Sequence, residues 1–169
     1  MRKRTTLGQE PDQVVDACVR QVQRAMARPE TRVAIMRALK PYNRGTGHGD
    51  LNGEGLPQAI LELCKSITFY REPAGHEFPG EVVQSPTLTL EVRGGDCDDV
   101  AVLAATAGAV MGCEAMIGQY PTSEDGSSAH IVAAIRPGWY APAQGWIVID
   151  PQNQTPTGAA VNGARWRRV

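Results

Sequence analysis

The stretch from Val100 to Met111 constrains the fold of this chain more than any other, because nearly all of its side chains are apolar. A helix that is apolar all round is buried inside a globular protein. The preceding run, Gly94-Gly95-Asp96-Cys97-Asp98-Asp99, combines glycines suited to a tight turn with polar residues suited to a helix start. We therefore predict a central, buried helix that begins at about Cys97.

Apolar periodicity elsewhere predicts helices first and strands second. The expected helices cover Pro11 to about Ala27, Thr31 to Leu39 and Leu56 to Thr68. The expected extended segments are Thr87 to Val92, Glu114 to Gln119, His130 to Ile135 and Gly145 to Asp150. The expected loops and irregular segments are Tyr42 to Gly55, Pro73 to Pro86, Pro121 to Ser128, Pro137 to Gln144 and Pro151 to Val169. This order is typical of an α+β fold.

Length and charge bound the organisation and the partners of the chain. Its 169 residues suffice for one domain, and no internal repeat or domain boundary is visible. A net charge of −1 gives no support to a nucleic-acid partner, and we interpret the basic runs Arg2–Arg4 and Arg165–Arg168 as solvated tails. No apolar run is long enough to cross a bilayer, and polar residues stand where a signal peptide needs apolar ones. We expect no membrane association and a cytoplasmic location.

The four cysteines differ in their sequence environments. None forms a C-x-x-C pair, so neither a zinc site nor a redox pair is indicated. Cys18 and Cys64 lie in apolar-periodic stretches and are predicted to be buried, and Cys113 follows the expected end of the central helix. Cys97 is different, because unpaired N–H groups at a helix start favour the thiolate and can stabilise an oxyanion. Three neighbouring aspartates oppose this effect unless they cap the helix.

A base and an acceptor for such a thiol stand on two later strands. His130 opens one apolar strand, and Asp150 closes the next, 20 residues later. If the two strands pair as an antiparallel hairpin, these side chains become neighbours at one end of the sheet, facing the helix of Cys97. A nucleophile, a base and an orienting acceptor are what covalent acyl transfer requires. We therefore predict a catalytic site of Cys97, His130 and Asp150.

Each of these residues also has a purely structural interpretation. Cys97 could be a buried thiol, His130 an exposed residue of an edge strand, and Asp150 a turn residue before Pro151. The aspartates around Cys97 could bind a divalent cation together with His130, although adjacent acidic residues at a helix start more often act as caps. We predict no metal site and no cofactor.

The three motifs together resemble those of transglutaminase-like, papain-related domains. The resemblance is carried by Gly95-Asp96-Cys97-Asp98-Asp99-x-Ala101, by Ser128-Ala129-His130-Ile131-Val132 and by Trp146-Ile147-Val148-Ile149-Asp150-Pro151, in the family's order of cysteine, histidine and aspartate. It covers roughly Leu56 to Pro151, and the spacing of 33 residues from Cys97 to His130 also fits.

This resemblance implies a fold, a reaction and a substrate class. The expected fold is a papain-like core in which the cysteine helix packs on an antiparallel sheet. The expected reaction is thiolate attack on a peptide or carboxamide carbonyl, followed by acyl transfer to water or an amine. The substrate would be a peptide or protein. Gln84 is a candidate second oxyanion donor, Tyr70 a candidate wall of the cleft, and Asp96 a further candidate contact for substrate.

A second function is compatible with the same resemblance. Short chains with the Gly-Asp-Cys-Asp-Asp form resemble transglutaminase-like proteins encoded among phage structural genes. The alternative is therefore a virion structural or assembly protein that keeps the fold with little or no catalysis. Its partners would be virion proteins, and its location the bacterial host cytoplasm or the virion.

Overall fold

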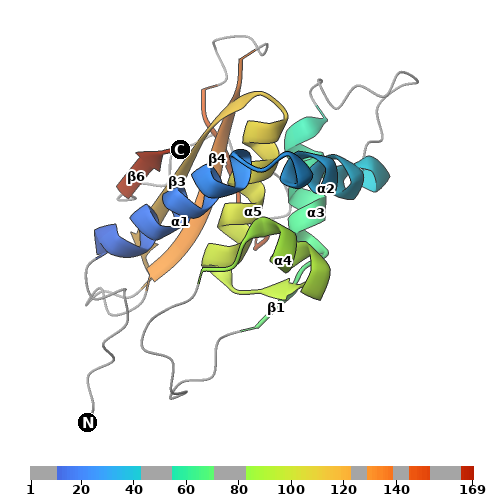
Figure 1. The fold of residues 1–169 in the computed structure, drawn as a ribbon. Coiled ribbons are helices and arrows are strands. Elements are labelled where there is room, and N and C mark those ends of the chain that lie inside the picture. The colour runs from blue at the N-terminus through green and yellow to red at the C-terminus, as the bar shows by residue number, and fades with distance from the viewer. Residues whose placement is uncertain (1–10, 43–54, 71–82, 123–128, 139–144, 153–164) are drawn as a thin grey trace.

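The computed structural model describes residues 11–42, 55–70, 83–122, 129–138, 145–152 and 165–169. In this part of the chain, five α-helices pack on a four-stranded antiparallel sheet, which confirms the α+β class (Figure 1). The helices are α1 (Pro11–Met26), α2 (Pro29–Leu39), α3 (Leu56–Lys65), α4 (Pro86–Val92) and α5 (Cys97–Val110), with a 3-10 turn at Lys40–Tyr42. The main sheet contains β3 (Cys113–Pro121), β4 (Ala129–Pro137), β5 (Ile147–Ile149) and β6 (Arg165–Arg168).

Helix α5 is the centre of the molecule, as its apolar sequence predicts. It begins at Cys97, and Val102, Leu103 and Ala104 are fully buried. Each of the other four α-helices contacts α5, and α5 itself lies on β3 and β4. Gly108 permits this close packing, because a Cβ at that position would overlap the side chain of Ile135.

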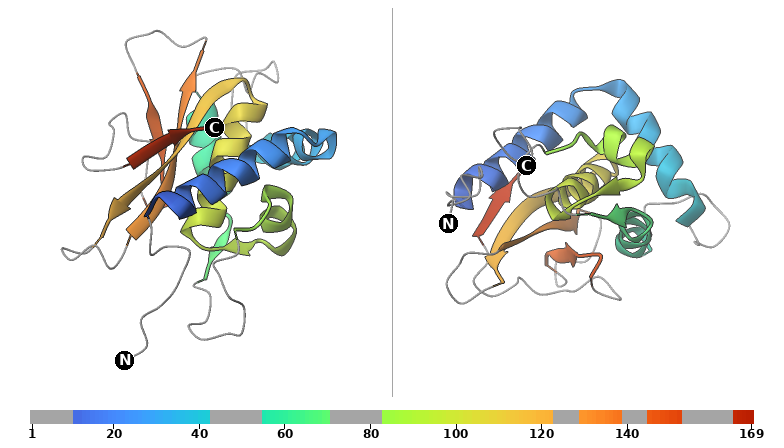
Figure 2. Two further views of the ribbon diagram at one scale, coloured as in Figure 1. Left: turned by 60° about the vertical axis from the view of Figure 1, so that its left-hand side comes forward. Right: turned by 90° about the horizontal axis from the view of Figure 1, so that it is seen from below.

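The sheet has the order β5-β4-β3-β6, with all neighbours antiparallel. Side chains alternate along β3 and β4, so Ile117, Ile131 and Ile135 join the helical core. Met116 and Val132 instead join a smaller cluster on the second face, against which Tyr120, Trp146 and Trp166 pack. Figure 2 shows α1 and α5 together on one side of the strands.

The predicted early helices are confirmed with small changes at their ends. Helix α1 ends at Met26, and α2 starts two residues early because Pro29 fits the first turn of a helix. Helix α3 ends at Lys65, three residues before the predicted end. Thr68 and Phe69 instead form β1 (Thr68–Phe69), which pairs in parallel with β2 (Gly94–Gly95).

The extended segment predicted over Thr87 to Val92 is wrong, because these residues form most of α4. Ser85 caps this helix by accepting a hydrogen bond from the Leu88 N–H, and Pro86 occupies its first turn. The alternation of Thr and apolar residues was a misleading signal over so short a window. Burial of Pro86 and Thr89, three residues apart, follows a helical period instead.

The prediction that the glycines before Cys97 make a tight turn is also wrong. The left-handed residue is Arg93, with φ of 54°, whereas Gly94 and Gly95 are extended in β2. The glycines are needed for space: a Cβ on Gly94 would lie 2.5 Å from the Tyr70 ring, and one on Gly95 2.7 Å from the Asp99 Cβ. Their lack of side chains lets β1 and α5 approach the same backbone.

The C-terminal segment is not simply an irregular, solvated tail, because Arg165–Arg168 forms β6 and pairs with β3. The indole of Trp166 lies over Gly118, where any Cβ would collide with it. Arg167 pairs with Asp16 at 3.7 Å, and Arg168 pairs with Glu114 at 3.5 Å. A cross-strand glycine and ion pairs therefore anchor a basic segment that has little apolar pattern of its own.

Most of the predicted loops, the Arg2–Arg4 run and much of Pro151 to Val169 lie outside the described residues. None of the helices in the described part of the chain is both long and apolar enough to span a bilayer.

Candidate functional site

Cys97 is the first residue of α5 and is half-buried, whereas Cys18, Cys64 and Cys113 are buried. Burial raises the pKa of Cys64 and of Cys113 to about 12. Cys97 is therefore the cysteine that can meet a substrate in this structure. It lies at the positive end of the dipole of α5.

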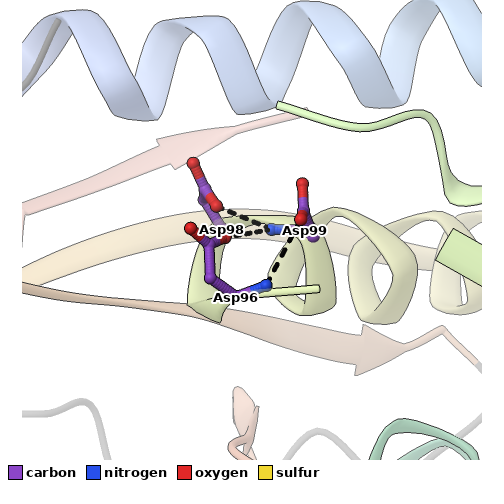
Figure 3. Close-up of side chains that lie close together, drawn as sticks. All are labelled: Asp96, Asp98 and Asp99. Carbon is purple, nitrogen blue, oxygen red and sulfur yellow. Dashed lines mark hydrogen bonds between the residues drawn. The ribbon is translucent and has the colours of Figure 1, made fainter. Parts of the chain in front are cut away.

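The aspartates around Cys97 act as helix caps. Asp96 and Asp99 form a capping box, in which each side chain accepts a hydrogen bond from the other residue's backbone N–H. Asp98 Oδ1 also accepts from the Asp99 N–H at 2.9 Å (Figure 3). The three carboxylates lie within 4.8 Å of one another, close enough for a cation. Their hydrogen bonds to backbone account for the cluster structurally.

Gln84 and Tyr70 form a network with Asp99 beside the start of α5. The Gln84 Nε2 donates to Asp99 Oδ2 at 2.8 Å and to the Tyr70 hydroxyl at 2.9 Å. The Gln84 N–H also donates to Asp99 Oδ1 at 2.7 Å. An amide nitrogen carries only two hydrogens, so both are already engaged. The Tyr70 hydroxyl, in contrast, is the acceptor in its bond with Gln84, so this bond does not use its own hydrogen.

His130 and Asp150 are brought together as the hairpin predicts. Strands β4 and β5 pair antiparallel, and His130 Nε2 lies 3.2 Å from both oxygens of Asp150. Both side chains are buried, at 8% and 4% residue exposure. Burial acts to raise the pKa of Asp150, but hydrogen bonds from His130 and from the Gln152 N–H hold this pKa below its usual value. An ionised Asp150 can only accept, so Nε2 carries the hydrogen and Nδ1 is the basic nitrogen.

Tyr120 is a member of this site that the sequence analysis missed. It lies opposite His130 in the β3–β4 register, and the two rings meet edge-on with centroids 5.4 Å apart. Its hydroxyl also lies close enough to Asp150 to help lower the pKa of that carboxyl group. Only the register of β3 against β4 reveals this residue, because nothing in the segment around Tyr120 resembles a catalytic motif.

Cys97 and His130 lie at the same end of the molecule. Gly108 of α5 packs on Ile135 of β4, and these elements run in the same direction because β3 reverses between them. Cys97 precedes Gly108 by eleven residues, and His130 precedes Ile135 by five. At about 1.5 Å per helical residue and about 3.3 Å per strand residue, both intervals span about 16 Å.

The side-chain directions differ from the prediction, which had His130 and Asp150 face the helix of Cys97. His130 shares the second face of the sheet with Tyr120, whereas the next residue, Ile131, points into the helical core. Cys97 nevertheless acts electrostatically on Tyr120. The first turn of α5 and the start of β4 therefore lie at the same end of the sheet, with Cys97 and His130 on different sides of it.

No protein-family model matches the chain, and no curated protein matches it.

Proposed function

We propose that this chain is a cysteine-nucleophile acyl-transfer enzyme of the peptidase, amidase or transglutaminase type, built on a papain- or transglutaminase-like core. One observation carries the proposal. A buried imidazole is held by a carboxylate through Nε2, at the same end of the fold as a half-buried thiol on a helix start. This combination supplies a base with a fixed tautomer and a nucleophile at the positive end of a helix dipole, with the neighbouring aspartates engaged as caps.

In the proposed reaction, Nδ1 of His130 takes the thiol proton, and the Cys97 sulfur attacks a peptide or carboxamide carbonyl. The tetrahedral intermediate collapses, the C–N bond breaks, and the imidazolium returns the proton to the leaving amine. The same histidine then activates water or an amine, which attacks the thioester and releases Cys97. Asp150 stays ionised throughout and stabilises the imidazolium.

The oxyanion of this intermediate needs donors beside Cys97. The backbone N–H of Cys97 at the start of α5 is the first. The second candidate is the hydroxyl of Tyr70 rather than the amide of Gln84, because both Gln84 hydrogens already bond to Tyr70 and Asp99. In this arrangement Gln84 orients Tyr70, and Asp99 orients Gln84.

The test is the rate of Cys97 alkylation by iodoacetamide against pH, resolved by mass spectrometry. A reactive pair gives fast alkylation well below pH 8.5, the approximate pKa of a free thiol, and His130→Ala abolishes it. Arg136→Ala, on the same strand, is the matched control and should behave as wild type. Cys64 and Cys113 serve as internal unreactive standards.

The opposite outcome contradicts the enzyme. If Cys97 titrates as a free thiol and His130→Ala changes nothing, the site has no activated nucleophile. The alternative proposal, a virion structural or assembly protein that keeps this fold, would then be tested by copurification with capsid or tail proteins.

A further inference from the structure

Tyr120 contacts both partners of the His130–Asp150 pair, from a third strand. The rings of Tyr120 and His130 are perpendicular, with an interplanar angle of 89°, so the imidazole packs against an aromatic wall. His130 is directly opposite Tyr120 in the register, so the two side chains are cross-strand neighbours.

The hydroxyl of Tyr120 acts on the carboxylate that orients His130. Asp150 accepts from His130 Nε2 at 3.2 Å and from the Gln152 N–H at 3.0 Å, and the nearby Tyr120 hydroxyl also helps to lower the pKa of Asp150. Three groups therefore stabilise the negative charge of Asp150, and only one of them is the imidazole. Each donor to a carboxylate stabilises the ionised form and reduces its basicity toward the others.

We propose that Tyr120 is a positioning residue of this site: its ring holds the imidazole plane, and its hydroxyl limits how strongly Asp150 stabilises the imidazolium. This inference rests on the proposed acyl-transfer function and adds a residue to it. Tyr120 acts through His130 and Asp150, without taking part in bond making or breaking.

The electrostatic surroundings keep the hydroxyl in its donating form. Burial raises the pKa of Tyr120, and the nearby Asp150 and Cys97 raise it further. These two are the titratable groups that act on Tyr120 in the described part of the chain, and His130 and Tyr120 are those that act on Asp150. The phenol therefore stays protonated across the neutral range and remains a donor.

Removal of the Tyr120 hydroxyl should shift the midpoint pH of Cys97 alkylation in a definite direction. In Tyr120→Phe, Asp150 loses the hydroxyl that helps to stabilise its charge, so this charge is more available to His130 and the thiolate–imidazolium pair becomes more favourable. The midpoint pH of Cys97 alkylation should fall by about half a pH unit. Tyr120→Leu, which also loses the aromatic wall, should instead slow alkylation at pH 7 by about tenfold, because the imidazole is no longer held.

The experiment combines alkylation with proton NMR of the His130 ring. In Tyr120→Phe, the Nε2-bound proton should move downfield because its bond to Asp150 shortens. Tyr42→Phe, the same change at a residue that packs in the helical core, is the matched control and should leave both readouts at wild type. Tyr120→Leu supplies a second test if the phenylalanine variant folds poorly.

The outcomes separate this proposal from the proposed function. An unchanged Nε2 proton and alkylation midpoint in Tyr120→Phe, with wild-type alkylation in Tyr120→Leu, overturn the role of Tyr120. A shifted Nε2 proton in a protein whose Cys97 reacts like a free thiol supports the role of Tyr120 and contradicts the enzyme.

Discussion

The two sides of Cys97 use carboxylates for different purposes. At the start of α5, Asp99 accepts hydrogen bonds from two backbone N–H groups and the Gln84 amide, none of which titrates in the neutral range. At the strand ends, Asp150 pairs with the imidazole of His130, beside the phenol of Tyr120. The first arrangement caps the start of α5 and fixes Gln84 beside it, while the second can move a proton. The partner of a carboxylate, more than its burial, therefore indicates whether it serves structure or chemistry.

Among the variants that test this comparison, replacement of Asp150 should have the largest effect, and it should fall on the reactivity of Cys97. Asp150→Asn removes the charge that stabilises the imidazolium, so the alkylation rate of Cys97 at pH 7 should fall about 10- to 100-fold. The measurement is site-resolved alkylation by mass spectrometry. A rate within twofold of wild type would show that Asp150 is only a turn residue.

The equivalent change at Asp99 should affect stability instead. Asp99→Asn weakens the capping box and the bonds to Gln84, so the free energy of unfolding should fall by about 1–3 kcal/mol. Urea denaturation measures this loss, and alkylation of the folded variant should stay within about threefold of wild type. A large loss of Cys97 reactivity without a loss of stability would show that Asp99, like Asp150, serves the chemistry.

A methyl group at Gly95 tests how closely β2 packs against Asp99. Gly95→Ala places a Cβ against Asp99, within 2.7 Å of its Cβ, so β2 or the helix start must shift. We expect a loss of about 1–2 kcal/mol in the free energy of unfolding, from urea denaturation. Gly138→Ala is the matched control, because a Cβ there meets nothing within 4 Å. Equal losses in both variants would contradict the close fit.

The smallest expected effect is on the pH dependence of stability. The pKa of Asp150 lies below its usual 3.8 in the folded protein, so the unfolded chain takes up this proton first as pH falls. The stabilising contribution is complete above about pH 5 and is lost as pH falls through the folded pKa. Urea midpoints between pH 6 and pH 3 should fall less steeply in Asp150→Asn than in wild type. Parallel curves would show that Asp150 has no depressed pKa.

Local patterns predicted a large part of the fold. The apolar run after Cys97 predicted a central helix, and the strands that carry His130 and Asp150 paired as expected. Two segments failed because their structure depends on distant partners or on a single cap. Ser85 and Pro86 turn Thr87–Val92 into a helix, and Gly118 gives Trp166 a place on the sheet.

The sequence by itself determined which residues stand at the critical positions: a cysteine at the start of an apolar helix, a histidine at one strand start and an aspartate at the next strand end. These follow from local periodicity and chain order, because helix and strand periods are properties of consecutive residues. Only the tertiary structure decided what those residues meet. Strand register placed Tyr120 on His130, and close approach of β1 to β2 engaged Gln84 with Tyr70 and Asp99. Such contacts join residues far apart in the chain, and their geometry depends on packing that no local pattern encodes.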